Sequence, residues 1–333
     1  MLYLTTRNPA ESYTSHRALH GDCLSDSGQL VPMQTPLFLK EDILSLDKLS
    51  FAQMVAKVLN MFFDKQFGGW DIEFAIGRSC VKYTPLNHRI MVAKLWYNRE
   101  QSYKRFEKAI YEKLIGTSVS GQNVPQWPRI AIRIAVLFGI AAELAKDGIS
   151  CFDAAVPADD LDLIFAVWYA KQMGLPVGAV LCGSVEDSAM WELLRNGELS
   201  APRQSGNTAG GLEQLLFDLL GRDVCRKYVA WVQNDGTFRI TEEQKNMLNS
   251  HFFISVASKD RINGLIKSVY RSGDFLLDPS TAVSYGALQD YRAKKGEGRM
   301  TLILADESPL KAADAIRKAT GLSVAQLKSK LNA

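Results

Sequence analysis

The sequence predicts an α/β fold with a largely parallel sheet, because short apolar strands and helices alternate along its second half. Residues 149–156 form an apolar, β-prone run, and a helical pattern over 161–173 ends at Gly174, with Pro176 beyond it. A strand at 177–182 and a helix at 185–195 repeat this order, and 300–305 adds a late buried strand. Helical connections of this kind join parallel strands.

Helical spacing predicts most of the remaining elements. Ser50 precedes a helix over 51–63 and is a good N-cap for it. A short strand at 90–93 is followed by a helix from about 101 to 114, a Gly/Ser/Pro-rich loop at 116–128 and a helix at 129–145. Two short strands and a small helix are expected within residues 1–40. Further helices are expected at 211–220, 241–250, 259–272, 281–294 and 310–320.

Composition narrows the class of protein. The chain has 333 residues, 47% of them hydrophobic and 23% charged, with a net charge of +3, which is ordinary for a globular protein and gives no basic tract for nucleic acid. The apolar stretch 130–145 contains Arg133 and Glu143 and is too short and too charged to span a bilayer. The N-terminus lacks a secretory signal pattern. Five scattered cysteines, with no C-x-x-C pair, indicate reduced thiols in a cytoplasmic protein.

Several stretches occur in the same order as in a known enzyme family. They are Y-L-T-T-R at 3–7, S-G-Q-L-V-P at 27–32, N-V-P-Q-W-P-R-I at 123–130, Y-A-K-Q-M-G-L-P at 169–176, G-L-E-Q-L-L-F-D-L-L-G-R-D at 211–223 and D-P-S-T-A-V at 278–283. Together they resemble the threonine synthase family, whose members are fold-type II enzymes that use pyridoxal 5'-phosphate (PLP). The resemblance spans nearly the whole chain and implies the large, mostly parallel domain of that fold, which is also the tryptophan synthase β-like fold.

The resemblance also implies that one subdomain is missing. Lys104 and Pro157 are only 53 positions apart, whereas in the family a complete α/β subdomain of roughly a hundred residues lies between the matching motifs. We therefore expect an N-terminal threonine-synthase-like segment at 1–100, a cofactor-lysine helix with a short bridge at 101–128, and an α/β large domain at 129–333.

Lys104 is the candidate catalytic residue. Residues 95–106 read L-W-Y-N-R-E-Q-S-Y-K-R-F and are similar to the family's L-F-H-G-P-T-L-A-F-K-D-F, in which the lysine forms a Schiff base with PLP. Such a lysine must be deprotonated part of the time, and burial or a nearby cation favours this. The alternative is a solvated helix lysine beside Arg105 and Lys108.

The candidate phosphate loop is chemically altered. The family's V-P-T-G-N-F-G-D corresponds here to residues 156–162, V-P-A-D-D-L-D, so that Asp159, Asp160 and Asp162 stand where backbone amides of a Gly-rich loop would hold the phosphate. Each carboxylate would disfavour a phosphate dianion by at least about 1 kcal/mol. These aspartates either bind a cation such as Mg²⁺ or complement the dipole of the helix that they begin.

Asp306 corresponds to the position that contacts the pyridine nitrogen of PLP. The family's A-T-A-H-P-A-K aligns with A-D-E-S-P-L-K at 305–311, which replaces a threonine by Asp306. An aspartate can hold a protonated ring nitrogen. The alternative is a loop carboxylate that caps the next helix.

These observations lead to three hypotheses about function. The first is a degenerate or repurposed threonine synthase homologue that binds a small ligand or a protein, forms a homodimer or pairs with another biosynthetic enzyme, and holds PLP poorly. The second is an active PLP-dependent lyase or transferase, acting on an amino acid or an O-phosphohomoserine-like substrate, with Lys104 as Schiff-base lysine. The third is a structural scaffold without a ligand. We expect no nucleic-acid or membrane partner and no metal.

Overall fold

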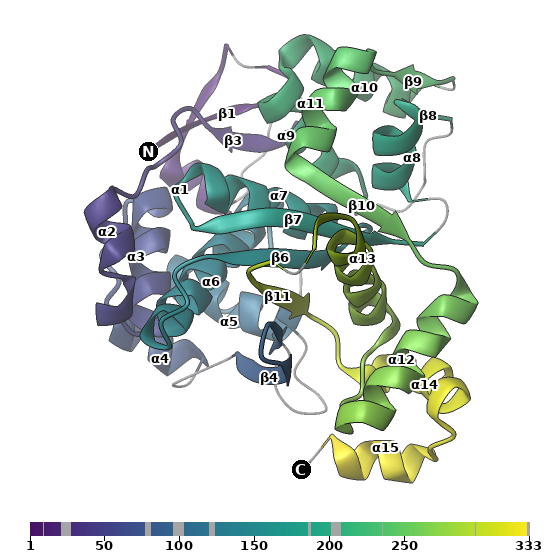
Figure 1. Ribbon diagram of the computed structural model, residues 1–333. Helices are drawn as coiled ribbons and strands as arrows, with labels where there is room; N and C mark the ends of the chain where they lie inside the picture. Colours follow the sequence, from purple (N-terminus) through teal and green to yellow (C-terminus); the bar gives the residue numbers. More distant parts are fainter. Residues whose placement is uncertain are drawn as a thin grey trace.

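A six-stranded sheet forms the centre of the molecule (Figure 1). The computed structural model describes residues 1–8, 10–20, 28–76, 81–95, 103–119, 124–185, 188–200, 208–234, 236–296 and 298–331. In spatial order the strands are β10 (Phe252–Val256), β7 (Val177–Ser184), β6 (Phe152–Pro157), β11 (Met300–Ala305), β5 (Ile90–Lys94) and β4 (Lys82–Asn87). The first five are parallel, and β4 pairs antiparallel with β5 at one edge.

Both faces of the sheet are buried, so the central strands are mostly apolar and do not alternate regularly with polar residues. Ala154 and Val156 of β6 face a core that they share with α6 (Gln126–Lys146) and α7 (Leu161–Gln172). Ala155, on the opposite side, faces a second core built with α12 (Lys259–Gly273) and α13 (Pro279–Lys295). The sheet therefore lies between two helical layers (Figure 1).

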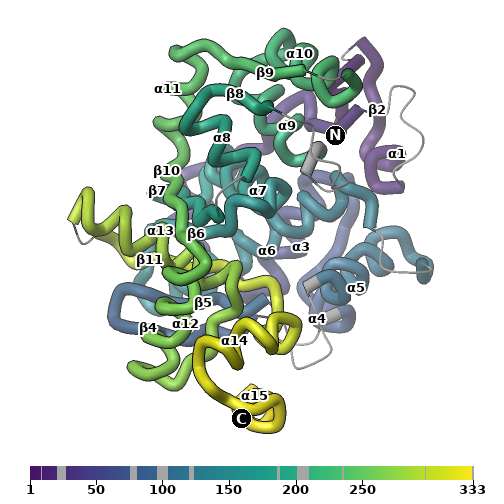
Figure 2. Tube along the Cα trace, turned by 90° about the vertical axis from the view of Figure 1, so that its right-hand side faces the viewer, coloured from purple at the N-terminus to yellow at the C-terminus, as the bar shows by residue number. Residues whose placement is uncertain are grey.

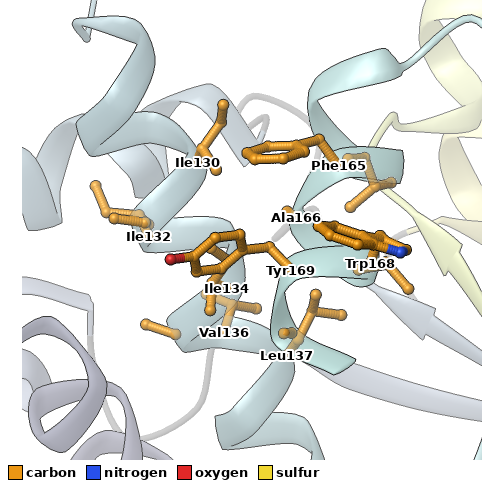
Figure 3. Close-up of a cluster of buried hydrophobic side chains, with 14 of the residues drawn as sticks. Ile130, Ile132, Ile134, Val136, Leu137, Phe165, Ala166, Trp168 and Tyr169 are labelled. Carbon is orange, nitrogen blue, oxygen red and sulfur yellow. The ribbon is translucent and has the colours of Figure 1, made fainter. Parts of the chain in front are cut away.

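Helices α6 and α7 pack tightly against each other. Ile130, Ile134 and Phe165 are fully buried in their interface (Figure 3), and the ring centroids of Trp127 in α6 and Tyr169 in α7 lie 6.1 Å apart. Burying each large apolar side chain contributes roughly 1.5–3 kcal/mol. This interface fixes the start of α7 relative to the first half of α6, where two arginines project towards it.

Gly183 allows α13 to approach the sheet. A Cβ at this position of β7 would lie 2.3 Å from the carbonyl oxygen of Val283 in α13, closer than real Cβ atoms approach. The glycine therefore sets the close approach of helix and strand, and with it the position of the first turn of α13.

The remaining elements surround this core, with the N-terminal segments and the C-terminal helices at opposite sides (Figure 2). They include α3 (Phe51–Phe63), which packs on α6, and α5 (Tyr103–Ile115), which also contacts α6. The others are β1 (Leu2–Thr5), β2 (Ser12–Thr14), α1 (Ser15–His20), β3 (Leu30–Pro32), α2 (Lys40–Leu44), α4 (Gly69–Ile76), α8 (Ala189–Asn196), β8 (Glu198–Leu199), α9 (Thr208–Leu220), α10 (Arg222–Gln233), β9 (Phe238–Arg239), α11 (Glu242–His251), α14 (Ala313–Thr320) and α15 (Val324–Lys330), with 3-10 turns at Leu46–Lys48 and Pro309–Ala312.

The predicted α/β fold and its mostly parallel sheet are confirmed, and so is the N-cap at Ser50, whose side chain accepts a hydrogen bond from the backbone N–H of Gln53. Strand β10 and helix α10 were missed. Strand β10 begins at Phe252, the residue that ends α11, so no turn signal separates the two elements. Within the described residues, no helix combines the length and the apolar character needed to cross a bilayer.

Residues 116–125 connect α5 to α6. Residues 96–102 and 120–123 are not among those that the structure describes. The division into segments 1–100, 101–128 and 129–333, and the loss of a subdomain at this bridge, therefore stay predictions. Cys23 and Cys80 also lie outside the described residues, whereas Cys151, Cys182 and Cys225 are free thiols.

Candidate functional site

A charged cavity of about 410 Å³ lies at the carboxyl ends of the parallel strands. It is bounded by α5, α6, the start of α7, the loop after β11 and the first turn of α13. All five candidate residues line it, and these are Lys104, Asp159, Asp160, Asp162 and Asp306. Open α/β sheets bind ligands in this position, and the volume is in the range of small-molecule pockets.

Asp160 occupies the N-terminus of α7. It is the N-cap residue, and its Oδ1 accepts a hydrogen bond from the backbone N–H of Leu163 at 3.0 Å. Both of its carboxylate oxygens also lie 2.7 Å from Nη1 of Arg133. The positive end of this helix, which could otherwise bind an anion, is therefore already engaged by a side chain of the protein.

Arg133 connects Asp160 to a second buried carboxylate. Its Nε donates to Oε1 of Glu107 in α5 at 2.9 Å, and Glu107 is only 2% exposed. Burial raises the pKa of Glu107, while the charge of Arg133 acts in the opposite direction. One guanidinium thus holds α5, α6 and α7 together, and removing a cation from such a buried group typically costs about 3–5 kcal/mol.

Asp162 is held by a second network. It accepts hydrogen bonds from Nε of Arg129 at 3.0 Å and from the side-chain amide of Gln126 at 3.3 Å. Gln126 also donates to Gln214 of α9. Gly211 lets α9 approach, because a Cβ there would lie 2.5 Å from the backbone of Leu161. Asp162 is consequently turned towards the protein and neutralised.

Asp306, like Asp159, lines the cavity without an ion pair to any described residue. It follows β11 directly. The protein surrounds it on nearly all sides, although part of its side chain remains accessible from the cavity. Burial, followed by the nearby charge of Asp160, raises the pKa of Asp306 to about 7. Its neighbour Glu307 forms an ion pair with Lys311.

Lys104 is the second residue of α5, and its side chain is exposed while it lines the cavity. Within the described part of the chain, no ion pair or hydrogen bond holds its ammonium group. The structure thus brings Lys104 into one cavity with Asp306, as the resemblance implies, but the catalytic role of Lys104 and the cofactor contacts of the four aspartates stay predictions.

Several lining residues were missed in the sequence, chiefly Glu107, Arg129, Arg133 and Glu307. A signal was present for the arginines, because Arg129 and Arg133 stand four residues apart in an otherwise apolar helix. Buried charges require partners, so this pair could have been assigned to nearby carboxylates. Glu107 and Glu307 carried no comparable signal.

The alternative of a metal cation bound by Asp159, Asp160 and Asp162 is not supported. Asp160 and Asp162 lie at the N-cap and in the first turn of α7, where they complement the helix dipole and pair with arginines. The residues that the structure describes contain no group of three or more His, Cys, Asp or Glu arranged to hold a metal ion.

Solved structures with the same architecture define the class. The PLP-bound threonine synthase from Brucella melitensis superposes with a TM-score of 0.82 at 19% identity, covering 100% of this chain and 94% of that one. Yeast threonine synthase gives a TM-score of 0.82 at 15% identity, covering 99% and 94%. The chain therefore has the fold of the fold-type II PLP-dependent enzymes.

Sequence comparisons find similar proteins of the same kind. Residues 2–80 match the family model for the threonine synthase N terminus. Threonine synthase from Pseudomonas aeruginosa is 26% identical over 216 residues, which cover 62% of this chain and 45% of that protein. Threonine synthase-like 1 from Homo sapiens is 23% identical over 185 residues, covering 51% and 25%. The chain is thus similar to threonine synthases, and it matches about half the length or less of these relatives.

Proposed function

We propose that this chain is a threonine synthase-like protein that does not synthesise threonine efficiently and instead binds a small ligand in the charged cavity. The observation that carries this proposal is the position of Asp160, whose carboxylate caps α7 and pairs with Arg133 where the family's loop would hold a phosphate. We further propose that the protein acts in the cytoplasm, as its scattered cysteines suggest.

The residues present do not fit the phosphate of PLP. The first-turn N–H of Leu163, which would bind a phosphate, already donates to Asp160. Asp159 and Asp162 replace the family's glycines, and Asp159, which forms no ion pair with a described residue, would disfavour a dianion by at least about 1 kcal/mol. An incoming phosphate would have to displace Asp160 from both the helix and Arg133.

The second candidate is an active PLP-dependent lyase, and one observation favours it. Lys104 and Asp306 line the same cavity, which is the arrangement needed if Lys104 is the Schiff-base lysine and Asp306 the contact of the ring nitrogen. PLP, when bound, supplies an electron sink for amino-acid chemistry. This candidate requires that another group replace the phosphate loop.

A titration with PLP separates the two candidates. We expect no change in the near-visible spectrum of the wild-type protein, no borohydride-stable label on Lys104 and no phosphate release from O-phosphohomoserine. The matched variant Asp159→Gly/Asp162→Gly restores both family glycines and should bind PLP more tightly than the wild type. A label on wild-type Lys104 that disappears in Lys104→Ala would establish the lyase candidate instead.

We also propose that the protein associates through α4, either with a second copy or with another biosynthetic enzyme. Trp70 and Phe74 stand one helical turn apart on α4 and are 85% and 88% exposed. Helix α4 packs on the Lys104-bearing helix α5, to which Asp71 is linked by an ion pair with Lys113 at 3.0 Å. Exposed aromatic pairs usually mark interfaces. A monomer by light scattering at micromolar concentration would contradict self-association.

A further inference from the structure

The six carboxylates that line the cavity fall into two groups, according to whether the protein itself supplies a cation. Four are paired, and the pairs are Asp160–Arg133, Glu107–Arg133, Asp162–Arg129 and Glu307–Lys311. The other two, Asp159 and Asp306, form no ion pair with any residue that the structure describes. Among the described residues that line the cavity, six carboxylates face three cations, Lys104, Arg129 and Arg133, so negative charge is in excess.

Asp306 is the more informative of the two unpaired carboxylates. Protein covers most of its surface and it lines the cavity, so its charge is less well hydrated than that of an exposed carboxylate. A buried carboxylate without a cation is costly, and proteins normally pair such groups. Arg133 acts electrostatically on Asp306 but is already shared between Asp160 and Glu107. Lys104 lines the same cavity and forms no ion pair with Asp306 in the described part of the chain, so the Asp306 carboxylate is available to a ligand.

We infer that the cavity binds a small molecule carrying a primary ammonium group, which donates hydrogen bonds to Asp306 and supplies the missing positive charge. This inference rests on the proposed ligand-binding function and adds the chemical class of the ligand. An ammonium group has three donors and no acceptor, which suits an isolated carboxylate. Asp159, which is exposed in the same cavity, offers a second unpaired carboxylate for a ligand with two ammonium groups.

Ligand binding should release a proton. The groups that face Asp306 are Asp160 at the start of α7, Arg133 of α6, Glu307 beside it in the loop and Asp278 before α13. Three of these four are carboxylates, and they favour the protonated form of Asp306. Because the pKa of Asp306 is raised to about 7, the protonated form of its carboxyl is populated at neutral pH. A bound ammonium group stabilises the ionised form and expels the proton.

Isothermal titration calorimetry at neutral pH, in two buffers with different ionisation enthalpies, tests this inference. The probe is putrescine, and its controls are 1,4-butanediol, which has the same length without charge, and succinate, which carries the opposite charge. We expect putrescine to bind with proton release, and we expect neither control to bind. In Asp306→Asn the affinity for putrescine should fall by about thirtyfold or more, and the proton release should disappear.

Asp314→Asn serves as the matched control variant, because Asp314 is almost fully exposed on α14, and it should bind putrescine like the wild type. The inference is overturned if putrescine binds no better than 1,4-butanediol, if succinate is preferred, or if Asp306→Asn retains full affinity. If PLP also fails to bind, any of these outcomes refutes the ammonium ligand but not the proposed function. Labelling of Lys104 by PLP would instead refute the proposed function itself.

Discussion

Replacing Asp306 with asparagine should stabilise the protein at alkaline pH. The folded state raises the pKa of this carboxyl from 3.8 to about 7, chiefly through burial. Between these two values the folded protein holds a proton that the unfolded chain has released, so the free energy of unfolding falls as the pH rises through this window. A shift of about three units corresponds to about 4 kcal/mol when the window has been crossed completely.

Urea denaturation of both proteins at pH 5 and pH 8 measures this effect. Asparagine has nearly the same shape and does not ionise, so the wild type should lose on the order of 2–3 kcal/mol relative to Asp306→Asn between the two pH values. Asp314→Asn, at an exposed site, should change the unfolding free energy by no more than about 0.5 kcal/mol at either pH. Equal pH dependence of the wild type and Asp306→Asn would refute the reasoning that Asp306 is buried without a cation.

Two further predictions concern packing and buried charge. Arg133→Met removes the cation shared by the carboxylates of Glu107 and Asp160 and should lower the unfolding free energy by about 3–5 kcal/mol. The additional change Glu107→Gln should restore part of this loss. A loss below about 1 kcal/mol in urea denaturation would show that the ion pairs are not buried as described. Gly183→Ala should cost about 1–3 kcal/mol or more, because its Cβ would lie 2.3 Å from the carbonyl oxygen of Val283. Gly264→Ala, in open space within α12, should instead gain up to about 1 kcal/mol, and thermal melting of the two alanine variants should move in opposite directions.

The sequence was sufficient to predict the α/β fold and most strands of the central sheet, because apolar runs and helical spacing are both local patterns. Apolar runs such as 300–305 and 177–182 are unmistakable where both faces of a sheet are buried. Strand β10 follows α11 without an intervening turn, and its run Phe-Phe-Ile-Ser-Val was overlooked because no Gly, Pro or Asn separates the two elements. Periodicity identifies elements well and their junctions poorly.

The site was predictable only in part. Its aspartates and Lys104 could be located through the family resemblance, since they occupy aligned motifs. The pairing of Arg133 with Glu107 and Asp160 could not, because it joins three elements whose relative placement depends on the packing of α6 against α7 and α5. This pairing leaves Asp159 and Asp306 without an ion pair to any described residue, and it is a property of the tertiary structure.

The sharing of Arg133 by two carboxylates restricts the order in which this part of the protein can change during evolution. Losing either Asp160 or Glu107 first leaves one guanidinium with one carboxylate, an intermediate that folds. Losing Arg133 first leaves two bare anions in the interior, an intermediate that selection should remove. Descendants of this chain that regain a neutral loop should therefore have discarded an acid before the arginine, and lineages with the arginine missing and both acids present should not be found.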